Sequence, residues 1–187
     1  IAAESHQRFE CRSSPYYQNT ALYPLIDLLQ RALQWHPEES AATRLVKLEQ
    51  LLSSSRLALT ETIPLLGMLL GIPLPEERYP ALPFTPQRQR QKLLETLLTL
   101  LCEEAERQPV LFILEDVHWT DPTTLEWLEL LIAQAPTAAL LILVTCRPEF
   151  PVPWGLRSYL TPMVLQRLPQ TEIAAMVLRM TGEKALP

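Results

Sequence analysis

Short apolar runs alternate along the chain with longer stretches in which apolar residues recur every three or four positions. Val110–Leu114 and Ala139–Val144 contain no polar residue at all. Parallel strands that are covered on both faces are apolar throughout, so these two runs predict central strands of a parallel sheet. Arg8–Arg12 predicts a further short strand, and Met163–Leu168 predicts a weaker one.

Helical periodicity fills most of the remaining sequence. Thr85 and Asp121 are the expected N-caps of two helices because each precedes a proline, and Gly71 is the expected C-cap of another. Strands that alternate with helices indicate an α/β fold, here with a helical insertion at about residues 40–71. The expected helices are Leu22–Trp35, Ser40–Leu52, Leu57–Leu70, Pro86 to about Arg107, Pro122 to about Ala135, and Pro169–Met180, the last one stopped at Gly182.

Composition excludes several classes of protein. The 187 residues are 48% apolar and 20% charged, with a formal net charge of -5, which is typical of a folded globular domain. The mild acidity disfavours direct nucleic-acid binding, which needs a concentrated positive surface. No apolar run approaches the roughly 20 residues of a membrane-spanning helix, so no membrane partner is expected. The three scattered cysteines form no disulfide framework and the three histidines show no zinc-ligand spacing, so we expect a cytoplasmic setting.

Two adjacent carboxylates, Glu115 and Asp116, follow the first apolar run. Ligands of open α/β sheets bind at the carboxyl ends of the strands, and neighbouring residues of a strand point to opposite faces. One acid can therefore face a phosphate-bound Mg²⁺, usually through water, while the other orients an attacking water. On these two residues alone, a pair of solubilising acids in a strand-to-helix turn explains the pattern equally well.

The surrounding segment, VLFILEDVHWTDPTTLEWL, adds an apolar run before the acids, and a His-Trp pair and a helix-starting Asp after them. It resembles the Walker B region of STAND-type signal-transduction ATPases of the AAA+ superfamily. The closest resemblance is to the ATPase modules that accompany bacterial adenylate/guanylate cyclases, protein kinases and LuxR-type regulators. Residues 8–31 are similar to the family's second strand and helix, residues 140–150 to its sensor-1 strand, and residues 164–187 to its fifth strand and helix.

The resemblance covers nearly the whole chain and implies a partial AAA+/STAND ATPase domain over residues 1–187. Walker B then lies at residues 110–116 and the sensor-1 strand at residues 139–147. The implied fold is a P-loop NTPase-like three-layer sandwich with a parallel sheet.

The resemblance also implies roles for four residues. Glu115 falls on the Mg²⁺-associated acid, with contact through water, and Asp116 on the water-activating acid, so both are candidate catalytic residues. Thr145 and Arg147 fall near sensor 1 and are candidate contacts of the nucleotide, where a guanidinium suits the charge of a γ-phosphate. A surface position before Pro148 remains the alternative for Arg147. The acids stand in the reverse of the usual Asp-Glu order, which leaves hydrolysis open.

Three further residues of the segment are expected to have structural roles. For His118 we favour a structural hydrogen bond over catalysis, for Trp119 packing under the following helix, and for Asp121 the helix cap.

A glycine-rich loop with Lys and Ser/Thr, which supplies most of the phosphate binding in such ATPases, is absent from the sequence. In the family this loop lies upstream of the segments matched here and a lid lies downstream. The family's phosphate-loop strand sits between the strands that match Ala139–Val144 and Met163–Leu168. The expected sheet is therefore incomplete, with an unpaired strand edge.

The expected function follows from the resemblance. It implies part of a regulatory domain that binds and hydrolyses ATP with Mg²⁺ and couples nucleotide state to an output module, such as a nucleotide cyclase, kinase or transcription regulator. The chain begins at Ile1, and we interpret it as a piece of a longer protein that is inactive by itself. Its expected partners are the nucleotide, the phosphate-loop segment, the lid and the output or sensor domains. The alternative is a catalytically degenerate NTPase-like scaffold for protein–protein interaction.

Overall fold

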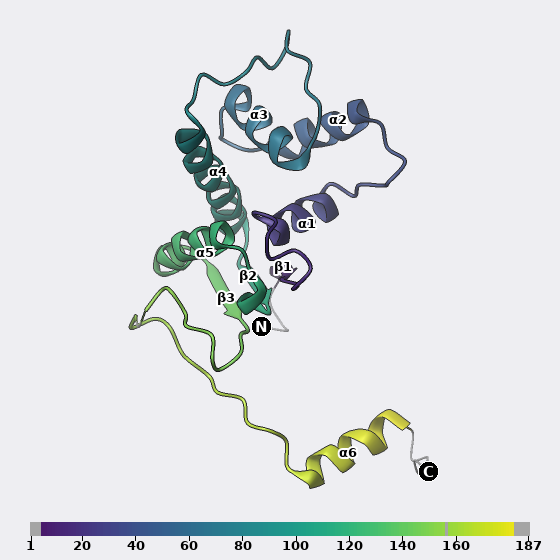
Figure 1. Cartoon of the computed structure of the whole chain (residues 1–187), viewed down its shortest axis with the longest axis vertical. Coiled ribbons are helices and arrows are strands. Elements are labelled where there is room, and N and C mark those ends of the chain that lie inside the picture. The colour runs from purple at the N-terminus through teal and green to yellow at the C-terminus, as the bar shows by residue number, and fades with distance from the viewer. Residues whose placement is uncertain (1–4, 156, 182–187) are drawn as a thin grey trace. The chain divides into compact units, whose positions relative to one another are not determined.

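A parallel sheet of three strands organises the computed structural model, which describes residues 5–155 and 157–181. The strands are β1 (Gln7–Arg12), β2 (Val110–Glu115) and β3 (Leu140–Val144), and they lie in the order β1-β2-β3 (Figure 1). β2 is the central strand and pairs in parallel with both neighbours. The predicted α/β class with a parallel sheet is thus confirmed.

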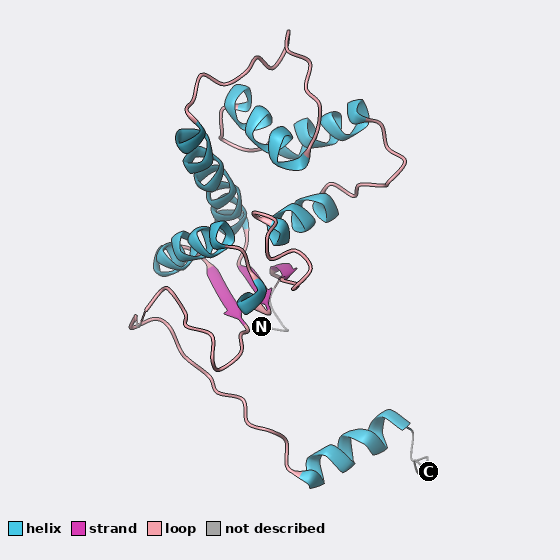
Figure 2. Cartoon of the chain, viewed as in Figure 1, coloured by secondary structure: helices cyan, strands magenta, loops and turns pink. Residues whose placement is uncertain are grey.

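Helices make up most of the rest of the described chain (Figure 2). None of those described combines the length and the apolar character that crossing a membrane requires. The helices are α1 (Tyr23–Ala32), α2 (Ala41–Leu52), α3 (Leu59–Leu70), α4 (Pro86–Arg107), α5 (Pro122–Gln134) and α6 (Gln170–Thr181), with short 3-10 helices η1 (Val117–Trp119) and η2 (Ala135–Thr137). Every helix expected from the sequence is present, with ends shifted by a few residues at most.

Local capping signals explain where several helices begin and end. The side chains of Ser40 and Thr85 accept backbone N–H bonds at the starts of α2 and α4, from Thr43 at 3.1 Å and Arg88 at 3.3 Å. Gly71 ends α3 in the left-handed conformation at φ 66°, where a side chain is disfavoured. These ends follow from residues within one helical turn, so they were predictable.

The core lies on one face of the sheet. Val110, Phe112 and Leu114 alternate along β2 and are at most 2% exposed. The Phe112 ring meets Trp127 of α5 edge-on, with 5.5 Å between the ring centroids. α5 therefore covers the buried face of the central strand, directly beside the end of the strand that carries the acids.

The other face of the sheet is partly open, contrary to the expectation that both apolar runs are covered on both sides. Leu141 and Leu143 of β3 are 48% and 47% exposed. In the described part of the chain, β3 pairs with β2 alone and forms an edge of the sheet. An apolar run shows that a strand is suited to burial, but the elements around it decide whether burial occurs.

The strand predicted at Met163–Leu168 is not formed. These residues carry no strand structure, and Met163, Val164 and Leu165 are 79–87% exposed. A strand exists only where its backbone exchanges hydrogen bonds with a neighbouring strand, and residues 163–168 form no such ladder. The segment and α6 belong to a second unit, residues 156–187, distinct from the unit of residues 1–155. The helix stop expected at Gly182 lies outside the described residues.

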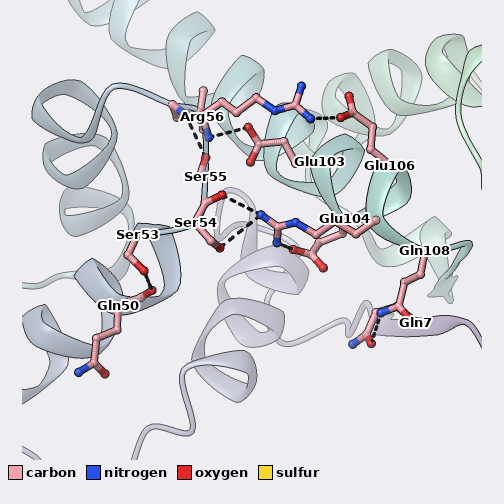
Figure 3. A network of polar contacts seen from close by, with 12 residues as sticks. Gln7, Gln50, Ser53, Ser54, Ser55, Arg56, Glu103, Glu104, Glu106 and Gln108 are labelled. Atoms are coloured by element: carbon pink, nitrogen blue, oxygen red, sulfur yellow. Dashed lines mark hydrogen bonds and ion pairs between the residues drawn. The ribbon is translucent and has the colours of Figure 1, made fainter.

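Two helices, α2 and α3, occupy the range of the predicted insertion, and α3 packs against α4 and α1 (Figure 1). Polar contacts fasten the loop between them to the end of α4 (Figure 3). The Arg56 backbone N–H donates to Oε1 of the buried Glu103 at 3.0 Å, and the Arg56 guanidinium pairs with Glu106. Arg107 donates to the Ser54 carbonyl oxygen at 2.8 Å. The insertion is thereby attached to the helix that leads into β2.

Candidate functional site

The acid pair lies at the carboxyl end of the central strand. Glu115 is the last residue of β2, and Asp116 follows it. Their side chains are 40% and 38% exposed, so both carboxylates reach solvent. Because all three strands run parallel, the residues that follow β1 and β3 lie along the same edge. This is the position that the sequence predicted for the acids.

Thr145 holds the turn in which Asp116 sits. Asp116 has a left-handed backbone at φ 57° and ψ 42°, a conformation that Asp adopts more readily than most residues. Its backbone N–H donates to Thr145 Oγ1 at 3.0 Å, and the Val117 N–H donates to the Thr145 carbonyl oxygen at 2.9 Å. Thr145, a predicted nucleotide contact, thus lies beside the acids and orients the second of them.

Arg12, which sequence analysis did not single out, is the cation that pairs with the acids. Its Nε atom lies 3.3 Å from Asp116 Oδ2 and 3.9 Å from Glu115 Oε2. Arg12 is the last residue of β1 and stands opposite Glu115 in the strand register. Its position in the sequence could have identified it, because one predicted strand ends at Arg12 and another is followed directly by Glu115. Neighbouring parallel strands bring such ends together.

Arg147 lies over the Trp119 ring instead, with its guanidinium carbon 5.4 Å from the ring centroid. That distance is typical of a cation–π contact. Among the described residues, no ion pair joins Arg147 to Glu115 or Asp116. Arg12 is therefore the arginine that pairs with the acids, and Arg147 contacts Trp119.

His118 makes no structural hydrogen bond, contrary to expectation. Both ring nitrogens are buried, and neither has a partner among the described residues. Its ring lies 5.0 Å from that of Trp119, tilted by 47°. Since a buried polar atom without a partner is costly, His118 is not a stabilising link from the strand end.

Asp121 is the predicted cap of α5, and it also joins α5 to α1. Its side chain is buried, and Oδ1 accepts the backbone N–H groups of Thr123 at 2.9 Å and Thr124 at 3.0 Å. Oδ2 accepts the Leu22 N–H at 3.1 Å and the Thr124 hydroxyl at 2.5 Å. Leu22 precedes α1 with a left-handed backbone, φ 59°, and has no side-chain cap of its own. One carboxylate therefore serves two helix starts, which no local motif predicts.

A second link reinforces this edge. The hydroxyl groups of Ser13, directly after β1, and Thr120, directly before Asp121, are hydrogen-bonded. The Ser13 backbone N–H donates to the Glu115 carbonyl oxygen at 2.9 Å, which extends the pairing of the two strands beyond their regular ends. The backbone around Arg12, Glu115 and Asp116 is thus fixed, while their side chains remain in contact with water.

The acid pair suits a hard divalent cation. Mg²⁺ prefers oxygen ligands and is usually held by one or two carboxylates, with water and phosphate completing its shell. Glu115 and Asp116 offer two such carboxylates and already attract a cation, the Arg12 guanidinium. The described residues contain no group of three or more metal-ligating side chains. The pair fits Mg²⁺ that is held mainly by water and substrate, and does not fit an all-protein metal cage.

Comparison of the chain with family models, with curated proteins and with solved structures finds no match.

Proposed function

We propose that the chain is part of a STAND-type ATPase domain of the AAA+ superfamily, which binds and hydrolyses ATP and regulates an attached output module. The observation that carries the proposal is the place of Glu115 and Asp116: two exposed acids at the carboxyl end of the central strand of a parallel sheet. Acids at this edge can take part in the chemistry of a bound phosphate. The resemblance of the Walker B segment to that family is the reason for proposing that this phosphate belongs to ATP.

The proposed roles follow the geometry of the edge. Glu115 would hold Mg²⁺ through water. Asp116, whose backbone N–H donates to Thr145 Oγ1, would orient the attacking water. Thr145 and Arg147 are the proposed nucleotide contacts on the β3 side. When bound, Mg²⁺ neutralises charge on the phosphates.

The unpaired edge of β3 supports the proposal that a strand of the complete sheet is missing from this chain. β3 has one partner in the described part of the chain, and Leu141 and Leu143 are half exposed. A phosphate-loop strand from the segment upstream would pair with this edge and, with its helix, cover the open face. The complete domain is then a P-loop NTPase-like three-layer sandwich, closed by a lid from the segment downstream. A nucleotide cyclase, a kinase or a transcription regulator is the proposed output module, in a cytoplasmic setting.

One observation favours a second candidate, a catalytically degenerate scaffold for protein–protein interaction. Arg12 neutralises part of the charge of the two acids, as a cation does in a purely structural ion pair. In that case the two acids stabilise the edge of the sheet and have no catalytic role.

Calorimetric titration with ATP and Mg²⁺ tests the proposal, on the chain alone and on the full-length protein with its phosphate-loop segment. We expect negligible binding to the chain alone, since it lacks the loop, and clear binding to the full-length protein. In the full-length protein, Asp116→Asn should abolish hydrolysis and retain binding. The control Asp27→Asn, at an exposed acid that pairs with Arg31 on α1, should leave both unchanged.

Three results would refute the proposal. The first is tight ATP binding by the chain alone. The second is ATP hydrolysis by the Asp116→Asn protein at the rate of the unaltered protein. The third is a full-length protein that binds no ATP, which would also support the scaffold.

A further inference from the structure

We infer that Arg12 is the resting counter-ion of the Glu115–Asp116 pair and that a divalent cation must displace it in order to bind there. The inference rests on the proposed function, because it concerns the same two acids. Its starting point is that the Arg12 guanidinium lies beside both carboxylates, with Nε 3.9 Å from Oε2 of Glu115, the proposed Mg²⁺ acid, and 3.3 Å from Oδ2 of Asp116.

The backbone that carries Arg12 is fixed, whereas its side chain is free to move. β1 pairs with β2 along its whole length, the preceding residue Cys11 is buried, and the following residue Ser13 bonds to the Glu115 carbonyl oxygen and to Thr120. The Arg12 side chain itself is 73% exposed. It can leave the acids by rotating into solvent, without any change in the sheet.

The contact is weak enough to be displaced. The Arg12 side chain is 73% exposed, and ion pairs between exposed side chains contribute little because water screens them. Two carboxylates against one guanidinium also leave a net charge of about -1 on the group. A divalent cation brings twice the charge of Arg12, so it competes effectively for the acids.

Arg8, another exposed arginine of β1, has an acid partner of its own and lies away from the Glu115–Asp116 pair. Arg8 lies four residues earlier on β1 and pairs with Glu10 of the same strand. At about 3.3 Å per residue, its backbone lies about 13 Å from that of Arg12, beyond the Debye length of about 8 Å at physiological salt. Arg8 is therefore a matched control: the same residue type, strand and face, with its own acid partner.

The expected effect is a gain in divalent-cation affinity when Arg12 is neutralised. A unit positive charge about 5 Å from a divalent ion in water weakens its binding by roughly tenfold. Arg12→Gln removes this charge and the competition for the carboxylates, so Mn²⁺ should bind about tenfold more tightly. Arg8→Gln should leave Mn²⁺ affinity unchanged. Because the effect is electrostatic, the gain should shrink as salt is added.

The experiment is a titration of the chain with Mn²⁺, followed through the electron paramagnetic resonance signal of free Mn²⁺. It compares the unaltered chain with Arg12→Gln, Arg8→Gln, Glu115→Gln and the double variant Arg12→Gln/Glu115→Gln. Circular dichroism spectra confirm that each variant is folded. The inference is supported if Arg12→Gln binds Mn²⁺ more tightly, Arg8→Gln does not, and the gain is lost in Arg12→Gln/Glu115→Gln.

The remaining outcomes separate the inference from the proposed function. If the unaltered chain and Arg12→Gln bind Mn²⁺ equally tightly and Glu115→Gln binds it more weakly, the role of Arg12 is wrong and Glu115 remains a metal site. If Glu115→Gln does not weaken Mn²⁺ binding, or if Arg12→Gln does not bind Mn²⁺, both the inference and the metal role of the acids are wrong. If Arg12→Gln binds Mn²⁺ more tightly but the full-length protein binds no ATP, the inference is supported and the proposed nucleotide function is wrong.

Discussion

Replacing Asp121 by alanine tests whether one carboxylate supports two helix starts. The side chain is 4% exposed and accepts four hydrogen bonds, two from backbone groups of α5, one from the Thr124 hydroxyl and one from the Leu22 N–H. Loss of an Asp cap costs about 1 kcal/mol. The buried Leu22 N–H left without an acceptor costs about 2 kcal/mol more. We therefore expect Asp121→Ala to lower the free energy of unfolding by about 3 kcal/mol.

Thr85→Ala is the matched control. Thr85 also caps a helix that begins with proline, but it lies at the surface and accepts one backbone bond, from Arg88 at 3.3 Å. Its removal should cost about 1 kcal/mol. The difference of about 2 kcal/mol between the two variants isolates the link from α5 to α1. Asp121→Asn, which keeps one acceptor oxygen, should fall between them.

Urea denaturation followed by circular dichroism measures these differences. With a slope of about 2 kcal/mol per molar, Asp121→Ala should lower the urea midpoint by about 1.5 M and Thr85→Ala by about 0.5 M. If the two variants differ by less than about 0.5 kcal/mol, the bond to Leu22 contributes no stability and the reasoning is wrong.

Two further predictions concern other parts of the molecule. Burial raises the pKa of Cys11 from 9.0 to about 12. The contribution of this thiol to the unfolding free energy is therefore constant below about pH 9 and falls above it, where the thiol of the unfolded chain ionises. Between pH 8 and pH 10.5, the unaltered chain should lose about 2 kcal/mol more unfolding free energy than Cys11→Ala in urea titrations, and equal losses would contradict this. Leu143→Lys, at a half-exposed position of the edge strand β3, should change the unfolding free energy by less than about 0.5 kcal/mol. The same substitution should reduce self-association in sedimentation velocity runs, because a charge on an edge strand opposes pairing with a strand of another molecule. Leu130→Lys, at an exposed position of α5, is its control, and an equal reduction there would remove the role of the sheet edge.

Local order in this chain is determined by short stretches of sequence. The apolar run Val110–Leu114, the cap residues Thr85 and Asp121, and Gly71 each act within a few residues, through backbone conformation or a hydrogen bond inside one turn. For that reason the helices, the three strands and the position of Glu115 at a strand end were all predictable.

The contacts that build the candidate site act over long stretches of sequence. Arg12 and Asp116 are 104 residues apart, and Leu22 and Asp121 are 99 residues apart. The order and register of β1 and β2 decide which side chains stand at the same height along the sheet edge. Periodicity contains no information on register, so neither Arg12 as the partner of the acids nor the second role of Asp121 could be derived from it.

Burial shows the same division. The sequence by itself determined that Ala139–Val144 is apolar enough to be buried, and it correctly predicted a strand there. It also predicted a weaker strand at Met163–Leu168, which contains Gln166 and Arg167. Only the tertiary structure decided that β3 is an edge strand with half-exposed leucines and that the second segment forms no strand. The physical reason is that a strand exists through hydrogen bonds to a neighbour and is buried by what covers it, and both are supplied by residues far away along the chain.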